Sequence, residues 1–214
     1  MTAYKVIANR QLTAETFVLR TERPNASILA GQCFSVGTED LAINREYSMY
    51  SGADDDYIDF LIRRVEDGRV SNALQVRPPA SMVEIGGPYG QFCLDEDKVK
   101  THKFLFVASG TGIAPFHSFV KTFSDLDYQL FHGVRHQNEK YDQEDYESKR
   151  YHSAVSQPED GRFGVRVTDL LKEYDLAEDE IVYLCGNRSM ITDCVEILRS
   201  KGIKGDSLFM ETFF

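Results

Sequence analysis

The sequence predicts two domains of similar size, an all-β domain in residues 1–98 and an α/β domain in residues 99–214. In the first half, short apolar segments of strand length are separated by turn residues. In the second half, apolar segments alternate with helical ones. Closely spaced strands are typical of a small barrel or sandwich, and strand–helix alternation is typical of a parallel sheet covered by helices. The boundary lies in the polar segment "DEDKVKTHK", where the pattern changes.

Six strands are expected in the first domain. In chain order they are "YKVIANRQL", "TFVLRTE", "QCFSVGT", "REYSMYSG", "YIDFLIRR" and "SMVEIGGP". In the fifth segment, Ile58, Phe60 and Ile62 fall on one face at period two, which predicts a half-buried antiparallel strand.

The second domain alternates strands and helices. The expected strands are "FLFVAS", "YQLFHGV", "RYHSAVS" and "EIVYLCG", and the expected helical segments are "PFHSFVKTF", "YDQEDYESK", "VTDLLKEY" and "RSMITDCVEILRSKG". The final segment, "SLFMETFF", ends in two phenylalanines, which predicts a packed terminus.

Composition excludes several classes of protein. The net charge of −10 is divided equally between residues 1–98 and 99–214, which argues against a nucleic-acid binder. No apolar run approaches the length of a membrane span, and no signal peptide is recognisable, so we expect a cytoplasmic protein without a membrane span. The four cysteines have neither zinc-site nor iron–sulfur spacing, so we expect reduced, mostly buried thiols and no metal site.

The segment "FLFVASGTGIAPF" runs from an apolar strand into Gly110, Thr111 and Gly112, and Pro115 stands where a helix begins. Glycines let a backbone approach a ligand closely, and the N–H groups at a helix start attract anions. A phosphate site is therefore one interpretation. The pattern is GxGxxP and not the dinucleotide fingerprint GxGxxG, so a tight strand-to-helix turn explains it equally well.

Two further motifs each allow two interpretations. In "EDGRVSNALQV", Ser71 is either the N-cap of a short helix or part of a helix start that receives a phosphate. In "YLCGNRSMI", Cys185 comes at the end of a strand, where open α/β sheets bind ligands, and it is either a cofactor contact or an ordinary buried cysteine.

Taken together, the order and spacing of the motifs resemble the ferredoxin–NADP reductase superfamily over essentially the whole chain. The matching segments are "REYS", "GRVSNAL", "GPYGQF", "GTGIAP", "HGVR", "YLCGN" and the aromatic C-terminus. The resemblance implies an N-terminal six-stranded antiparallel β-barrel that binds FAD and a C-terminal α/β domain whose parallel five-stranded sheet binds NAD(P). It also implies an NAD(P)H-dependent reductase that passes hydride to FAD and electrons to a ferredoxin-like or flavodoxin-like carrier or an oxygenase component.

For FAD, the resemblance assigns Arg45 to the diphosphate, Tyr47 to the face of the flavin ring and Ser48 to its reactive edge. Two diphosphate contacts, at Arg45 and at the amides of the "GRVSNAL" helix, favour FAD over FMN. The implied FAD residues are Arg45, Glu46, Tyr47, Ser48, Arg63, Val70, Ser71, Thr111 and Phe214. Adjacent residues of a regular strand point to opposite faces. If both Tyr47 and Ser48 contact one flavin, either the strand ends or twists near them, or Ser48 reaches the ring edge while Tyr47 covers its face.

For the nicotinamide nucleotide, the resemblance implies a second set of residues, namely Gly110, Thr111, Gly112, Pro115, Arg135, Ser156, Gln157, Cys185, Gly186, Asn187 and Met190. The implied catalytic residues are Ser48, Cys185 and Glu211, and Phe214 would shield the flavin until the nicotinamide displaces it. Gln157 stands where NADPH-specific relatives have an arginine, and two acidic residues follow it, which favours NADH. Arg135 and Arg162 are the cations left to reach a 2′-phosphate.

Three functions remain open at this level. The chain has no iron–sulfur motif, so the leading function needs a separate electron acceptor. The acidic first half weakens a ferredoxin partner, although Arg63, Arg64, Arg69 and Arg77 are candidates for a local basic patch. A reductase of free flavin or of another small acceptor is the second function, against which Tyr47 and Phe214 argue. An FAD-binding electron-transfer or sensory module without nicotinamide turnover is the third, against which "GTGIAP" and "CGN" argue.

Overall fold

The computed structural model describes residues 1–213, so the prediction for Phe214 lies outside the described residues. The chain divides into two compact units. The first comprises Met1–Leu94 and Ala114–Thr122, and the second comprises Asp95–Ile113 and Phe123–Phe214. The short helix after the glycine motif therefore groups with the all-β unit.

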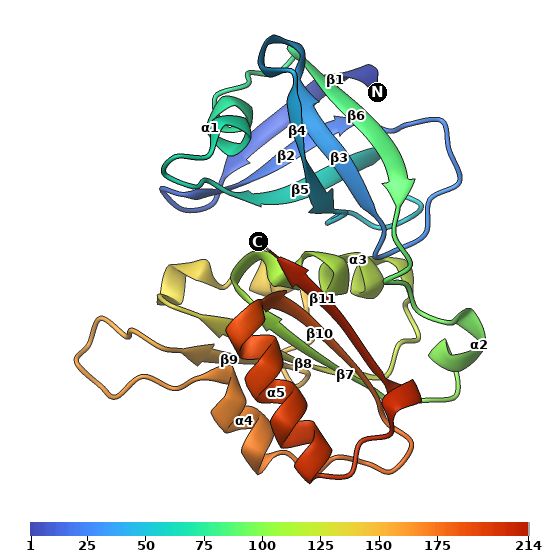
Figure 1. Ribbon diagram of the computed structural model, residues 1–214, viewed down its shortest axis with the longest axis vertical. Helices are drawn as coiled ribbons and strands as arrows, with labels where there is room; N and C mark the ends of the chain where they lie inside the picture. Colours follow the sequence, from blue (N-terminus) through green and yellow to red (C-terminus); the bar gives the residue numbers. More distant parts are fainter. Residues whose placement is uncertain (214) are drawn as a thin grey trace. The chain divides into compact units, whose positions relative to one another are not determined.

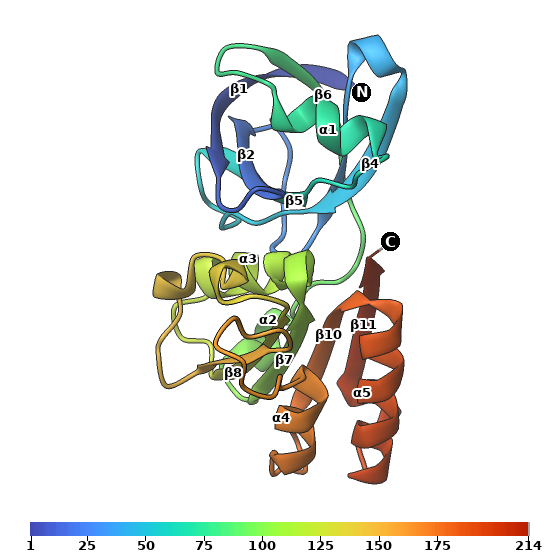
Figure 2. The ribbon, with the colours of Figure 1, turned by 90° about the vertical axis from the view of Figure 1, so that its left-hand side faces the viewer.

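The first unit is built on a six-stranded antiparallel sheet with the order β4-β3-β6-β1-β2-β5. Its strands are β1 (Thr2–Gln11), β2 (Thr16–Glu22), β3 (Cys33–Thr38), β4 (Ile43–Ser48), β5 (Tyr57–Arg63) and β6 (Met82–Tyr89). The outer strands meet just beyond β4, where Met49 forms a bridge with Phe60 and the Tyr50 N–H donates to the Asp59 carbonyl at 2.8 Å. The strands thus curve round into a barrel, which protects the sheet edges (Figure 2).

Strand β5 is more deeply buried than its pattern predicts. Ile58, Phe60 and Ile62 are buried as expected, but so are Asp59 and Leu61 between them. The half-buried interpretation is therefore wrong. Burial of the Asp59 carboxylate is tolerated because Arg20 donates to both of its oxygens at 2.8 Å.

Two helices belong to the first unit, α1 (Arg69–Gln75) and α3 (Ala114–Thr122). Helix α3 is held by His117, whose ring stacks on Tyr50 with centroids 3.8 Å apart. Thr122 adds a hydrogen bond, because its Oγ1 accepts from the Ala53 N–H at 2.9 Å. These contacts explain why α3 groups with the barrel.

The second unit is built on a five-stranded parallel sheet with the order β11-β10-β7-β8-β9. Its strands are β7 (Phe104–Ser109), β8 (Tyr128–Val134), β9 (Tyr151–Val155), β10 (Ile181–Asn187) and β11 (Leu208–Phe213). The segment expected to form a packed terminus supplies β11, an edge strand paired with β10. The predicted fold class of barrel followed by α/β domain is confirmed.

Helices α4 (Val167–Glu173) and α5 (Arg188–Ser200) contact each other and cover one face of this sheet (Figure 1). Side chains alternate along the strands, so β7 directs Leu105 and Val107 into the aliphatic core beneath these helices. Phe104 and Phe106 instead belong to a cluster of aromatic rings that includes Tyr183.

The remaining elements are short. They are α2 (Glu96–Val99), η1 (Glu39–Leu41), η2 (Gly110–Ile113), η3 (Gln137–Glu139), η4 (Gln143–Asp145) and η5 (Gly205–Ser207). The helix expected in "YDQEDYESK" is wrong, since only the 3₁₀ turn η4 forms there. Asp142, which precedes that turn, has a φ of 44°, and the segment has no apolar stripe to bury. Within residues 1–213, no helix has both the length and the apolar character that a bilayer crossing requires.

Candidate functional site

The first candidate site lies where β4 ends. Strand β4 pairs with β3 up to Ser48, and the chain then leaves the regular ladder for the single Met49–Phe60 bridge. The strand thus ends at Ser48, as expected, but Tyr47 and Ser48 are both still paired with β3, opposite Phe34 and Cys33, so they keep the regular alternation of a strand. Ser48 is buried and Tyr47 half-buried. Burial raises the pKa of the Tyr47 phenol to about 12, an effect that the nearby Arg45 partly opposes.

The five arginines that the sequence analysis singled out in this unit fall into two groups. Arg63 forms an ion pair with Glu15 at 2.8 Å, and Arg77 pairs with Asp40 at 2.5 Å. Arg45, Arg64 and Arg69 form no ion pair within the part of the chain that the structure describes; Arg45 donates only to the backbone carbonyl beside it, at 2.8 Å. We call Arg45, Arg64 and Arg69 the unpaired arginines.

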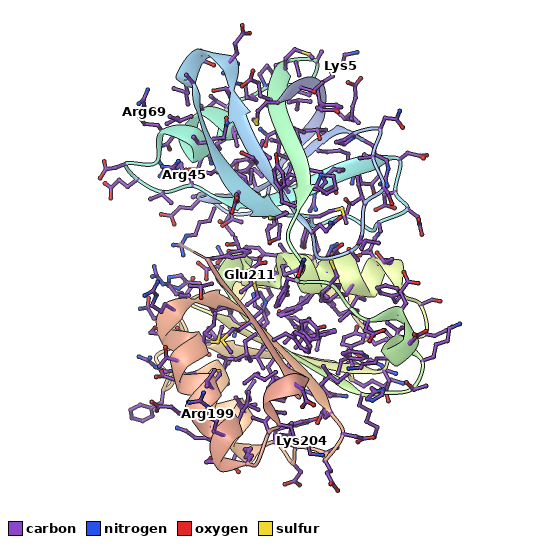
Figure 3. The ribbon with its side chains drawn as sticks, turned by 45° about the vertical axis from the view of Figure 1, so that its right-hand side comes forward. Lys5, Arg45, Arg69, Arg199, Lys204 and Glu211 are labelled. Carbon is purple, nitrogen blue, oxygen red and sulfur yellow. The ribbon has the colours of Figure 1, made fainter. Side chains whose placement is uncertain are left out.

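The unpaired arginines come from neighbouring elements. Arg45 lies on β4, Arg69 begins α1, which contacts β4, and Arg64 directly follows β5 (Figure 3). A guanidinium without a carboxylate partner is ready to bind an anion, and its fork matches phosphate oxygens. These residues fit a diphosphate, the group that joins the halves of FAD, whereas Arg63 is already engaged by Glu15.

Helix α1 begins one turn earlier than predicted. Its N-cap is Gly68, and Ser71 is the third helical residue, so the prediction of a Ser71 N-cap is wrong. The Ser71 hydroxyl accepts from the Val65 N–H at 3.1 Å and donates to the Gly68 carbonyl at 3.3 Å. It thereby shapes the turn before the helix, while the first N–H groups of α1, including that of Val70, have no acceptor within the helix.

The second candidate site lies at the carboxyl ends of the parallel strands. The order in which the chain adds strands reverses between β7 and β10. These two strands are adjacent in space although β8 and β9 intervene in sequence. Such a switch point is where open α/β sheets bind ligands. The residues predicted for the nucleotide gather at this edge: Gly110–Gly112 follow β7, Arg135 follows β8, Ser156 and Gln157 follow β9, and Cys185–Asn187 end β10.

Two glycines allow the β7 turn to pack directly on β10. A Cβ on Gly112 would overlap the Cys185 carbonyl and the Gly186 Cα. A Cβ on Gly186, where φ is +140°, would overlap Ser109. Gly110 differs, because its φ of +54° favours glycine while the space around it is open. The "GTG" and "CGN" motifs therefore form one closely packed unit.

A hydroxyl joins the two strand ends. The Ser109 Oγ accepts from the Asn187 backbone N–H at 3.0 Å and from its Nδ2 at 2.9 Å. The Asn187 Oδ1 in turn accepts from the Met190 N–H at 2.9 Å and caps α5. Asn187 is exposed, whereas Met190 is buried in the core beneath α5.

A buried histidine supports the same turn from below. The His132 Nε2 lies 2.9 Å from the Gly110 carbonyl oxygen, and its Nδ1 lies 2.9 Å from the Tyr151 hydroxyl. His132 is fully buried, and this burial lowers its pKa to about 4. The imidazole is therefore neutral at physiological pH.

Cys185 and Glu211 are neighbours on adjacent strands, since Cys185 of β10 pairs with Glu211 of β11. Burial raises the pKa of the Cys185 thiol well above its usual value, and the charge of Glu211 raises it further. Cys185 is fully buried, and its thiol stays protonated and uncharged.

The loop after β9 closes on itself. The Val165 N–H donates to the Val155 carbonyl at 2.9 Å, and the Ser156 hydroxyl donates to the Val134 carbonyl at 3.1 Å. At the tip, the Arg162 Nε donates to Asp160 at 2.7 Å. Arg162 is therefore already engaged by a carboxylate of its own loop.

Several predicted residues are not brought together within one unit. Ser48 belongs to the first unit and Cys185 and Glu211 to the second, while Pro115 lies in the first turn of α3. Three residues that no motif singled out take part in the second site, namely Ser109, His132 and Tyr151. Ser109 lies within "FLFVASGTGIAPF" and His132 within "HGVR", but neither motif pointed to these two side chains.

Comparison with known proteins agrees with the division into two domains. Residues 4–93 match the oxidoreductase FAD-binding domain family and residues 106–196 match the oxidoreductase NAD-binding domain family. These matches define a two-domain oxidoreductase that binds a flavin and a nicotinamide nucleotide. Each half of the chain therefore belongs to its oxidoreductase domain family, and the whole fold is that of a ferredoxin–NADP reductase.

Two relatives from Pseudomonas putida are components of oxygenase systems. The chain is 27% identical over 222 residues to the toluate 1,2-dioxygenase electron transfer component of Pseudomonas putida, covering 95% of this chain and 65% of the relative. It is 28% identical over 186 residues to the naphthalene 1,2-dioxygenase system ferredoxin–NAD(P)⁺ reductase component of the same species, covering 79% and 56%. The chain thus spans less than two thirds of the length of these relatives.

Among solved structures, a ferredoxin NADP⁺ reductase from Neisseria gonorrhoeae with bound FAD and NADP has the same fold, with a TM-score of 0.80 at 20% identity. The match covers 100% of this chain and 98% of that one.

Proposed function

We propose that this protein is an NADH-dependent flavoprotein reductase that delivers electrons to a separate carrier protein or oxygenase component. The observation that carries the proposal is that one chain holds both sites: unpaired arginines beside a strand end in the FAD-binding domain, and a glycine turn at the switch point of the NAD-binding domain. A cytoplasmic location is part of the proposal, because reduced nicotinamide nucleotides are made and used there.

The chain's own residues bind and orient FAD and the nicotinamide nucleotide. FAD, when bound, supplies an acceptor for hydride and a donor of single electrons. Arg45, Arg64 and Arg69 bind its diphosphate, while Tyr47 covers the ring and Ser48 donates a hydrogen bond at the ring edge. The glycine turn and the start of α5 bind the nucleotide, with Cys185 and Glu211 beside the nicotinamide.

The preference for NADH rests on the loop after β9. A 2′-phosphate needs a fixed cation, and Arg162 is already paired with Asp160 at the tip of this loop. Exposed Glu159 adds a second negative charge. Arg135 is the cation that remains for NADPH, so we expect weak rather than absent use of NADPH.

The partner follows from the relatives. Those from Pseudomonas putida are named as components of dioxygenase systems, so we propose a redox protein or oxygenase component as the acceptor. Reduction of free flavin is the competing function, and an FAD module without nicotinamide turnover is the competing non-enzyme.

The test is an anaerobic titration of the purified protein, first with FAD and then with NADH or NADPH, followed by visible spectroscopy. We expect FAD binding and faster bleaching by NADH than by NADPH. A protein that cannot take up FAD contradicts the proposal, and bound FAD that neither nucleotide bleaches favours the non-enzyme. Faster turnover with added free FMN than with a ferredoxin favours the free-flavin reductase.

A further inference from the structure

The hydrogen bonds of His132 specify one form of its ring. A carbonyl oxygen only accepts, so the contact to Gly110 requires the proton on Nε2. In the neutral ring Nδ1 is then an acceptor, and the Tyr151 hydroxyl donates to it. Tyr151 therefore selects the tautomer that allows His132 to bond to Gly110.

This bond is a specific restraint on Gly110. Gly112 and Gly186 are held by close backbone packing, but the space where a Cβ of Gly110 would stand has no atom within 4 Å. Glycine populates a positive φ such as this +54° about as readily as a negative one, so neither packing nor a backbone preference determines the turn there. The imidazole of His132 supplies the missing contact from within the sheet.

The direction of one carbonyl determines that of the next amide. In a trans peptide, the Gly110 carbonyl and the Thr111 N–H point in opposite directions. Because the carbonyl is bonded to buried His132, the Thr111 N–H points away from the sheet interior. An outward N–H at the carboxyl end of a parallel strand is a donor for an anionic ligand.

We propose that His132 and Tyr151 are positioning residues for nicotinamide nucleotide binding, acting through Gly110 to hold the Thr111 N–H toward the phosphates of the nucleotide. This inference rests on the proposed function for the identity of the ligand. Neither side chain contacts the nucleotide; both act by keeping the turn in its binding form before the ligand arrives.

The test compares four variants of the FAD-loaded protein. His132→Leu removes the donor, Tyr151→Phe removes the group that selects the tautomer, and His132→Gln keeps an N–H donor. Tyr174→Phe is the matched control, because it also removes a tyrosine hydroxyl bond in the same unit, the 2.6 Å contact to Glu180, away from the glycine turn. The measurements are kcat and KM for NADH, the Kd of NAD⁺, and the ¹⁵N NMR signals of the histidine rings.

Losing one well-placed hydrogen bond predicts a rise of about three- to tenfold in KM for NADH and in Kd for NAD⁺. We expect this rise in His132→Leu and Tyr151→Phe with kcat nearly unchanged, and recovery toward wild type in His132→Gln. Tyr174→Phe is expected to leave both constants unchanged. In wild type the His132 signals report a proton on Nε2, and in Tyr151→Phe they report a mixture of tautomers.

Each failure has a distinct meaning. A proton on Nδ1 in wild type overturns the inference, as does wild-type nucleotide affinity in Tyr151→Phe, a variant that loses only one oxygen atom. An equal loss of nucleotide affinity in Tyr151→Phe and Tyr174→Phe would mean that His132 and Tyr151 have only a structural role, and it would also overturn the inference. If wild type binds neither NADH nor NADPH, the proposed function fails instead, whatever the tautomer.

Discussion

The two units prepare to bind anions by different physical means. Beside β4, the preparation is side-chain charge, in the form of Arg45, Arg64 and Arg69, which have no carboxylate partner among residues 1–213. At the ends of β7 and β10 it is backbone geometry, set by Gly112 and Gly186 in close contact. Because of this difference, we expect ligand binding at the first site to depend on side-chain charge. At the second site we expect it to be sensitive to the addition of a single methyl group.

The largest expected effect comes from Gly112→Ala. The added Cβ meets the backbone of Cys185 and Gly186, which cannot move aside as a side chain can. Displacement of the turn by an ångström would lower the rate of flavin reduction by NADH about 100-fold. Stopped-flow absorbance measures this rate.

Gly110→Ala is the matched control for volume. A Cβ there meets open space, so its cost is the positive φ alone, roughly 1 kcal/mol in the free energy of unfolding. FAD content should be normal in both variants. Equal effects of the two substitutions would contradict the claim that close packing sets the second site.

Removal of charge at the first site is expected to be the next largest effect. Arg45→Ala loses a charge-assisted contact worth about 1.5–3 kcal/mol, which raises the Kd of FAD roughly 10- to 100-fold. Fluorescence quenching of added FAD measures that constant. Arg77→Ala removes an arginine that is already paired with Asp40 and should leave the Kd of FAD unchanged. A similar rise of this Kd in both variants would show that general charge, and not the unpaired arginines, binds the flavin.

Lowering the pH should affect the two sites differently, because the arginines stay charged throughout while neutral His132 gains a proton in acid. Its pKa is about 4 when folded and near 6.5 when unfolded, so protons favour the unfolded chain as pH falls below 6.5. Between pH 7.5 and pH 5 this linkage lowers the free energy of unfolding by about 2 kcal/mol. The loss continues until pH falls through about 4.

Urea unfolding at pH 7.5 and pH 5 measures the effect. His132→Gln lacks the titrating group, so its stability should fall less over this interval. His152, an exposed histidine of β9 bonded to Gln129, is the control, and His152→Gln should retain the full pH dependence of wild type. A wild-type slope in His132→Gln would exclude His132 as its source.

The smallest expected effect concerns the nucleotide. Asp160→Asn releases Arg162 from an exposed ion pair, and such pairs are weak because solvent screens them. The ratio of kcat/KM for NADPH to that for NADH should therefore rise about two- to fivefold. Steady-state assays with both nucleotides measure it, and an unchanged ratio would mean that Arg162 does not reach the 2′-phosphate.

Local patterns were sufficient where one short segment carries its own signal. The segment "FLFVAS" is β7 residue for residue, because an apolar run bounded by a glycine turn has few alternatives. The sequence pattern gave a wrong prediction where two nearby residues could fill the same structural position. Ser71 looked like an N-cap, but Gly68 took that place and the Ser71 hydroxyl bonded to Val65.

The sequence by itself determined the two domains, the order of their strands along the chain and the motifs that define the superfamily. Each of these depends on residues close together in the chain. Only the tertiary structure decided that Ser109 joins Asn187, 78 positions away, and that His132 lies between Gly110 and Tyr151. Hydrogen bonds between strands depend on sheet order and register, and a sheet that places β10 beside β7 brings together groups that no local pattern connects.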